Sequence, residues 1–168
     1  FDAPEDVFPG DSVSLTYDGD TLFFLNSDNS GMMYELNPDT GAVLDADYVP
    51  GRDIAAVAGK IYYISSLFSG FINEFDPVSD TTTAAINFGG LNGVGLGAGM
   101  AGITGPSGIM VQTDVGTIVE VNRLTGLIVG PGFTPDGSSV ASIAVVGGQI
   151  YLGDLVDGDV GLALRDQL

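Results

Sequence analysis

The chain has 168 residues, 22 acidic side chains against 4 basic ones, and a formal net charge of −18. Hydrophobic residues make up 45% and charged residues only 15%, which is too apolar for a disordered chain and suits one domain with its own core. The negative charge disfavours nucleic-acid and anionic-lipid partners. The absence of His and Cys excludes Ser-His-Asp, Cys-His and imidazole-metal sites.

A repeated segment runs through the chain. It reads YELNPDTG at 34–41, NEFDPVSD at 73–80, VEVNRLTG at 119–126 and, in a shorter form, ALRDQL at 163–168. The corresponding turn residues Asn37, Asp76, Asn122 and Arg165 are 39, 46 and 43 residues apart. This spacing is typical of a four-stranded propeller blade.

Each unit predicts the same series of short strands, rich in β-branched and aromatic residues and bounded by Gly, Asp, Asn and Pro. First strands are expected at 12–17, 53–58, 99–104 and 140–146, and second strands at 21–25, 60–64, 108–112 and 149–153. Third strands are expected at 32–36, 71–75, 117–121 and 160–164, and outer strands at 41–49, 81–88 and 126–133. In the turn, Pro38 presets φ, Asn37 accepts from the backbone and Gly41 supplies a left-handed residue.

The expected fold is an all-β propeller of four four-stranded blades, about 42 residues each, in one domain over 1–168. The blades cover about 11–50, 51–90, 95–134 and 138–168. The last unit lacks an outer strand, and residues 1–10 resemble the end of one, so the N-terminal strand is expected to complete that blade. It could belong to the same chain, giving a four-bladed ring, or to a neighbour, giving an eight-bladed ring or a fibre.

The third-strand pattern, Glu-apolar-Asn/Asp-Pro-x-Thr-Gly, resembles the repeats of bacterial quinoprotein-like and YVTN-type β-propellers. The resemblance covers essentially the whole chain and implies a fold without implying an activity. Quinoprotein-like blades carry a docking tryptophan, and this chain has no Trp. No quinone cofactor is therefore expected.

Two acidic loops are candidate calcium sites, because they place oxygen ligands close together beside a glycine. NSDNSG at 26–31 contributes Asn26 and Asp28, and DLVDGD at 154–159 contributes Asp154, Asp157 and Asp159. Neither completes a 12-residue EF-hand loop, and a solvated turn explains the same composition. Calcium is the one candidate ion, and no organic cofactor is predicted.

Three glutamates, Glu35, Glu74 and Glu120, recur at one position of the third strand, with Ala163 aligned to them in the last unit. They could form a ring of carboxylates around a cation, but a structural role in the repeat is favoured. A glycine-rich run at 89–102 contains the formal GxGxxG pattern at Gly97, Gly99 and Gly102. No helical period follows it, so close packing of strands is favoured over dinucleotide binding.

Apolar residues in segments expected to be loops or edges are candidate interface residues: Leu67, Phe68 and Phe71 in SSLFSGF, and Phe1, Val7 and Phe8 at the N-terminus.

The sequence thus favours a non-enzymatic structural or interaction module that binds protein, including other copies of itself as an oligomer or fibre. The alternatives are calcium-assisted binding of a glycan or protein, and a glycosidase-like enzyme that uses carboxylates alone. No membrane insertion is expected. The chain starts at Phe1, which indicates a processed or excised piece and an extracellular or cell-surface location.

Overall fold

The structure, a computed structural model, describes residue 4 and residues 13–27, 31–65, 71–87, 96–102, 108–113, 115–135, 140–146, 149–154 and 160–163. The N-terminal strand expected at residues 1–10 lies outside this part of the chain except for Pro4. Its pairing with the last unit stays a prediction.

The described residues form fifteen strands in four antiparallel sheets, and each sheet follows chain order. The first sheet holds β1 (Val13–Tyr17), β2 (Leu22–Asn26), β3 (Met32–Leu36) and β4 (Val43–Tyr48). The second holds β5 (Asp53–Val57), β6 (Lys60–Ile64), β7 (Phe71–Asp76) and β8 (Thr81–Asn87). The third holds β9 (Leu96–Gly102), β10 (Gly108–Thr113), β11 (Ile118–Asn122) and β12 (Ile128–Phe133). The fourth holds β13 (Val140–Val146), β14 (Gln149–Asp154) and β15 (Val160–Ala163). These bounds confirm the predicted all-β repeat.

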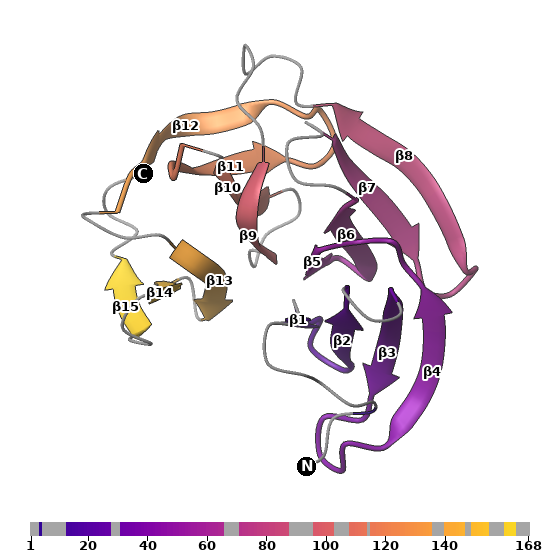
Figure 1. The fold of residues 1–168 in the computed structure, drawn as a ribbon. Helices are drawn as coiled ribbons and strands as arrows, with labels where there is room; N and C mark the ends of the chain where they lie inside the picture. The colour runs from indigo at the N-terminus through magenta and orange to yellow at the C-terminus, as the bar shows by residue number, and fades with distance from the viewer. Residues whose placement is uncertain are drawn as a thin grey trace.

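The four sheets follow one another around an arc, with β1, β5, β9 and β13 innermost and β4, β8 and β12 outermost (Figure 1). Neighbouring innermost strands contact each other in the order β1, β5, β9, β13. Within the described part of the chain, no comparable contact joins β13 back to β1. These two strands lie at the ends of the arc (Figure 1).

The hydrophobic core is divided among the spaces between successive sheets. Phe23, Leu25 and Met33 of the first sheet pack against Ile54 and its neighbours in the second. A second cluster joins the second sheet to the third, and a third cluster joins the third sheet to the fourth. Each inner sheet therefore buries both of its faces, one against the preceding sheet and one against the following sheet.

The repeated turn is built as the sequence predicts. Oδ1 of Asn37 accepts hydrogen bonds from the backbone N–H groups of Asp39 at 3.0 Å and Thr40 at 2.9 Å. Gly41 has φ of 72°, and its N–H donates to the carbonyl of Asn37 at 2.8 Å. Asn122 repeats the arrangement with Leu124 and Thr125, so the turn ties each third strand to its outer strand by the same mechanism.

The glycine-rich run enters strand β9 and makes a close approach between strands. A Cβ added to Gly102 would lie 2.1 Å from the carbonyl oxygen of Ala56 in β5. Gly97 and Gly99 also belong to β9, which is followed by strand β10. This agrees with strand packing near the centre of the arc, and the strand–turn–helix setting that a dinucleotide site needs is not formed by the described residues.

One alignment made from the sequence needs correction. Glu35, Glu74 and Glu120 lie opposite Phe23, Tyr62 and Met110 of their second strands. The last sheet pairs Ala163 with Ile150, whose side chain packs toward the third sheet, as Ile109 packs toward the second. Leu162, opposite Tyr151, therefore occupies the glutamate position. The alignment based on the turn residues placed Ala163 there because, relative to the turn, the pairing of β15 with β14 is shifted by one residue from that of the other third strands.

Candidate interaction surface on the first sheet

One position on the innermost strands shows how the first sheet differs from the others. Cross-strand register makes Leu15, Ile54, Met100 and Ile143 equivalent. Ile54, Met100 and Ile143 are buried against the preceding sheet, with exposed fractions of 1%, 3% and 7%. Leu15 is 60% exposed, and among the residues that the structure describes no sheet precedes its own. At this position the first sheet therefore exposes an apolar side chain that each later sheet buries.

Strand β1 separates its two sides by strict alternation. Val13, Leu15 and Tyr17 are exposed by 47%, 60% and 53%. Between them, Ser14 and Thr16 face β5: Oγ of Ser14 accepts from the N–H of Ile54 at 3.1 Å, and Oγ1 of Thr16 accepts from that of Ala56 at 2.9 Å. The polar residues thus join the first sheet to the second, and the apolar residues face away from it.

Cross-strand neighbours add further apolar residues to this side, because directly paired residues share a side. Asn26 and Leu36 lie on the same side by register but are fully buried. We define the first-sheet face as Val13, Leu15, Tyr17, Leu22, Phe24, Met32, Tyr34 and Tyr48. The rings of Phe24 and Tyr34 are in contact, with centroids 6.3 Å apart, and Tyr48 is 68% exposed. A sheet face this rich in aromatic and aliphatic residues is typical of a binding surface.

The last sheet has the complementary uncovered side. We define the last-sheet face as Ser142, Ala144, Val146, Gln149 and Tyr151, which share one side of β13 and β14. Ala144 is exposed, whereas the equivalent Ala55 and Ala101 are buried against the following sheet. Val146 is 64% exposed. The two ends of the arc therefore each carry an inter-sheet surface that lacks a partner sheet among the described residues.

A carboxylate joins three innermost strands. Asp53 of β5 accepts a hydrogen bond from Oγ of Ser14 in β1, and also from the backbone N–H groups of Ile54 and Met100. Protein atoms surround the carboxyl near the centre of the arc, and this burial raises its pKa to about 6 against the opposing effect of the three hydrogen bonds. Asp53 therefore links β1, β5 and β9 by hydrogen bonds, and its burial disfavours the ionised carboxylate.

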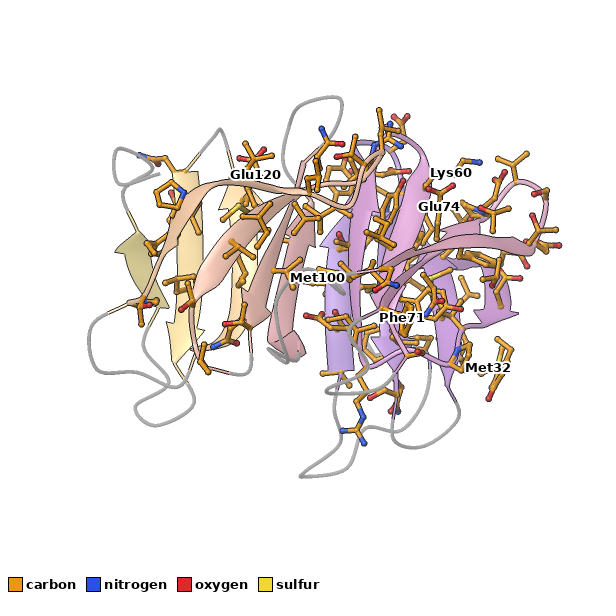
Figure 2. All side chains as sticks on the ribbon, turned by 90° about the horizontal axis from the view of Figure 1, so that it is seen from above. Met32, Lys60, Phe71, Glu74, Met100 and Glu120 are labelled. Carbon is orange, nitrogen blue, oxygen red and sulfur yellow. The ribbon has the colours of Figure 1, made fainter. Side chains whose placement is uncertain are left out.

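The three recurring glutamates do not meet at one point. They belong to three different sheets, and Figure 2 shows Glu74 and Glu120 on separate parts of the molecule. Among the described residues, no group of three or more carboxylates is arranged to hold a metal ion. The favoured structural interpretation agrees with this separation.

Glu74 belongs to a network between the second and third sheets. The hydroxyl of Tyr62 donates to Oε2 of Glu74 at 2.6 Å, and Thr83 donates to Oε1 at 3.2 Å. Nη1 of Arg123, from the turn after β11, donates to the Tyr62 hydroxyl at 3.0 Å. Burial, with Glu74 acting in the same direction, raises the pKa of Tyr62 to about 12. The network ties two sheets together through charge-assisted hydrogen bonds.

Glu35 lies instead in a group of like charges. Asp45 is directly opposite it on β4, and Asp47 lies two residues further along the same strand. Burial raises the pKa of Glu35, and the negative charges of Asp45, Asp47, Asp18 and Asp80 raise it further. The pKa of Asp47 is raised by burial and by Asp80 and Asp45. Mutual repulsion within this group therefore favours protonation of Glu35 and Asp47.

The predicted calcium loops are only partly covered by the structure. Asn26 is fully buried as the last residue of β2, opposite Val13 and Met32, and so belongs to the strand rather than to the loop that follows. Asp154 is the last residue of β14, and its side chain is outside what the structure describes. Asp28, Asp157 and Asp159 also lie outside the described residues. Calcium binding at either loop stays a prediction.

Among the predicted interface residues, Phe71 is described, at the start of β7, and is 42% exposed. Figure 2 shows it and Met32 toward the end of the molecule opposite Lys60 and Glu120. Leu67, Phe68, Phe1, Val7 and Phe8 lie outside the described residues. The first-sheet face was missed, although the alternation in SVSLTY, with Val, Leu and Tyr on one side, could have indicated it. In the part of the chain that is described, no helix is long and apolar enough to cross a membrane.

Solved structures show what the fold is similar to. Myxococcus xanthus glutaminyl cyclase is 13% identical, with a TM-score of 0.65 over 90% of this chain and 74% of that one. The computationally designed Ika4 protein is 14% identical, with a TM-score of 0.52 over 96% of this chain and 94% of that one. The WD40 repeats of RRP9 are 10% identical, with a TM-score of 0.55 over 96% of this chain.

The chain spans 53% of the RRP9 structure, about half its length. No known family model matches the sequence, and no curated protein does either. The likeness therefore concerns the fold, which is all-β and similar to WD40-repeat propellers. No family model supports the resemblance to quinoprotein-like and YVTN-type repeats, so the similarity is limited to the fold.

Proposed function

We propose that the chain is a non-enzymatic protein-interaction module of the β-propeller type. Its four sheets act as four blades, and the first-sheet face is its docking surface. The observation that carries the proposal is the exposure of Leu15, 60%, at a position where Ile54, Met100 and Ile143 are buried by a neighbouring sheet. Leu15 thus presents an apolar side chain to solvent at a position that packs against a neighbouring sheet in the later sheets, and a protein partner can bind there.

The chemistry of the first-sheet face supports a protein as that partner. Tyr17, Tyr48 and Leu15 offer large, shape-specific side chains, and tyrosine is enriched in protein interfaces because one end is apolar and the other polar. The side chains of the face carry no formal charge. Similarity to WD40-repeat structures is in line with this proposal, and the extracellular or cell-surface location expected from the sequence is compatible with it.

The test compares three forms of the immobilised protein in a protein extract of the source: wild type, Leu15→Asp and Val78→Asp. Val78 is 91% exposed on the turn between β7 and β8, so its variant adds the same charge away from the first-sheet face. The proposal predicts proteins that bind wild type and Val78→Asp but not Leu15→Asp. Identical binding by all three forms would contradict it. Circular dichroism of each variant checks that the fold is retained.

A further inference from the structure

The contact between the first and second sheets, which we call the first joint, is hydrogen-bonded at its inner end. The N–H of Ile54 in β5 donates to Oγ of Ser14 in β1 at 3.1 Å. The N–H of Ala56 donates to Oγ1 of Thr16 at 2.9 Å. Oγ of Ser14 also donates to the carboxyl of Asp53. The enclosed carboxyl of Asp53 therefore lies where the two sheets are bonded to each other.

A group of carboxylates from both sheets meets at the outer end of the first joint. Glu35 of β3 and Asp47 of β4 belong to the first sheet, whereas Asp80 belongs to the turn between β7 and β8 of the second. The negative charge of Asp80 contributes to the raised pKa values of Glu35 and Asp47. Oδ2 of Asp47 is buried and has no hydrogen-bond partner among the described residues. When they are ionised, these carboxylates repel one another across the joint.

The backbone of Asp80 has an unusual conformation for a residue with a side chain. In the repeated turn, the residue four positions after Asn37 and Asn122 is left-handed, and it is glycine in both cases, Gly41 and Gly126. Asp80 occupies the same position in the second sheet, with φ of 50°. Residues with a side chain adopt this region less readily than glycine. The second sheet thus places a carboxylate where the turns of the first and third sheets carry no side chain.

Basic side chains do not compensate these groups within the described part of the chain. Lys60 of β6 is paired with Asp76, and Arg52, beside Asp53, is exposed. Strands β9 and β10, which also contact β5, contain no ionisable side chain. No basic side chain of the described residues lowers the pKa of Glu35, Asp47 or Asp53. The other ionisable groups on the elements packed here are the tyrosines Tyr17, Tyr62 and Tyr63 and the carboxyls Asp18, Asp45 and Glu74.

The contact between the second and third sheets is built differently. There the Tyr62 hydroxyl lies between the Glu74 carboxylate and the Arg123 guanidinium, so a positive charge faces the negative one. Every described carboxyl whose pKa is raised lies instead at the first joint. Rising pH therefore adds uncompensated negative charge at this joint.

We propose that the first joint is a pH-dependent latch, which is closed in mild acid and opens locally as the pH rises toward neutral. Opening lets water solvate the ionised carboxylate of Asp53 and moves Asp80 away from the carboxylates of the first sheet. Because burial raises the pKa of Asp53 from 3.8 to about 6, the closed joint is favoured in acid and loses this advantage as the pH rises through about 6. The inference does not depend on the first-sheet face, so it stands or fails separately from the proposed function.

The test measures amide hydrogen exchange in the full chain by NMR between pH 5 and pH 7.5. Each rate is divided by the rate of an unstructured amide at the same pH, which removes the intrinsic pH dependence of exchange. The N–H groups of Ile54 and Ala56 report on the first joint, because they donate across it. The N–H of Thr113, which donates to the carbonyl of Thr117 at 2.8 Å in the third sheet, is the reference. Between pH 5 and pH 7, protection of Ile54 and Ala56 should fall about tenfold relative to Thr113, as the two pKa values of Asp53 require.

Three variants identify the groups responsible. Asp53→Asn has no carboxyl to ionise, so most of the tenfold change should disappear. Asp80→Asn removes a carboxylate at an exposed position where asparagine tolerates the left-handed backbone, and it should raise the protection of both reporter amides at pH 7 above that of wild type. This exposed substitution keeps the test decisive if Asp53→Asn fails to fold. Asp39→Asn removes the same charge from the exposed turn between β3 and β4 and should match wild type.

The outcomes distinguish local opening from a change in the whole fold. A fall in protection at Ile54 and Ala56 that exceeds the fall at Thr113, and that Asp53→Asn and Asp80→Asn reduce, supports the latch. A parallel fall at all three amides would overturn it, because pH would then act on the fold as a whole. Protection of the two reporter amides that does not depend on pH, or that falls equally in wild type and both variants, would also overturn it. The proposed function is tested separately, by partner capture with Leu15→Asp.

Discussion

Asp53 makes the stability of the fold depend on pH in a direction that can be worked out. Its carboxyl has a pKa raised from 3.8 to about 6, mainly by burial. The folded state therefore holds a proton on Asp53 at pH values where the unfolded chain has lost it. The stability that this proton contributes is fully present below 3.8, the pKa of the unfolded chain, and is lost as the pH rises through about 6, the pKa of the folded state. The protein should be more stable in mild acid than at neutral pH.

The magnitude follows from the two pKa values. A shift of about 2 units corresponds to about 3 kcal/mol between the fully protonated and fully ionised limits. Of this, about 1.3 kcal/mol falls between pH 5 and pH 7. This range keeps the protein away from its isoelectric point near 4.1. Glu35 and Asp47, whose pKa values are also raised, change stability in the same direction, and Asp76, whose pKa is lowered by Lys60, changes it in the opposite direction.

The assay is urea unfolding of wild type and Asp53→Asn at several pH values between 5 and 7.5. Asn has no proton to lose here, so the difference between the two slopes isolates Asp53 from Glu35, Asp47 and Asp76. We expect wild type to lose about 1.3 kcal/mol more than the variant between pH 5 and pH 7. Parallel profiles would refute the reasoning, because they would mean that the Asp53 carboxyl titrates alike in the folded and unfolded states.

Three further changes test the packing between and within the sheets. Gly102→Ala should cost about 1–3 kcal/mol in urea unfolding, because its Cβ would overlap the carbonyl of the adjacent strand, and an unchanged midpoint would contradict that approach. Tyr62→Phe should lower the free energy of unfolding by about 1–3 kcal/mol, because it removes the hydroxyl that bridges the Glu74 carboxylate and the Arg123 guanidinium. Tyr63→Phe is the control, because its hydroxyl has one contact, at 3.5 Å, and its loss should be smaller. Equal losses in the two variants would argue against the network. Asp45→Asn should stabilise the protein by about 0.2–1 kcal/mol by relieving repulsion across β3 and β4, and added salt should then raise its melting temperature less than that of wild type. The exposed turn variant Asp39→Asn is its control, and a matching gain there would point to net charge alone.

The sequence predicts the strands well because their physical determinants are local. Alternating apolar residues, the Asn37 turn and the left-handed Gly41 each act within a few residues. Each strand formed by the described residues lies within three residues of its expected bounds. The one-residue shift of β15 was not predictable in this way. The shift depends on which residue of β14 packs against the third sheet, and this packing joins residues that are far apart in the sequence.

The candidate site was harder to predict for the same reason. Leu15 and Ile54 have similar side chains in similar strands, but Ile54 packs against the first sheet and is buried, whereas Leu15 is exposed. The network of Tyr62, Glu74 and Arg123 likewise joins residues from two repeats. Repeat analysis favoured a structural role for Glu35, Glu74 and Glu120 alike, but it could not show that the three positions would have different neighbours.

The most direct test of the docking surface uses the absence of cysteine from the chain. Leu15→Cys and Val78→Cys each introduce a single thiol, one on the first-sheet face and one on the remote turn. Alkylation rates are measured with and without a protein extract of the source. If the first-sheet face binds a protein partner, the extract slows alkylation at position 15 relative to position 78. An equal effect of the extract at both positions would contradict docking at this face.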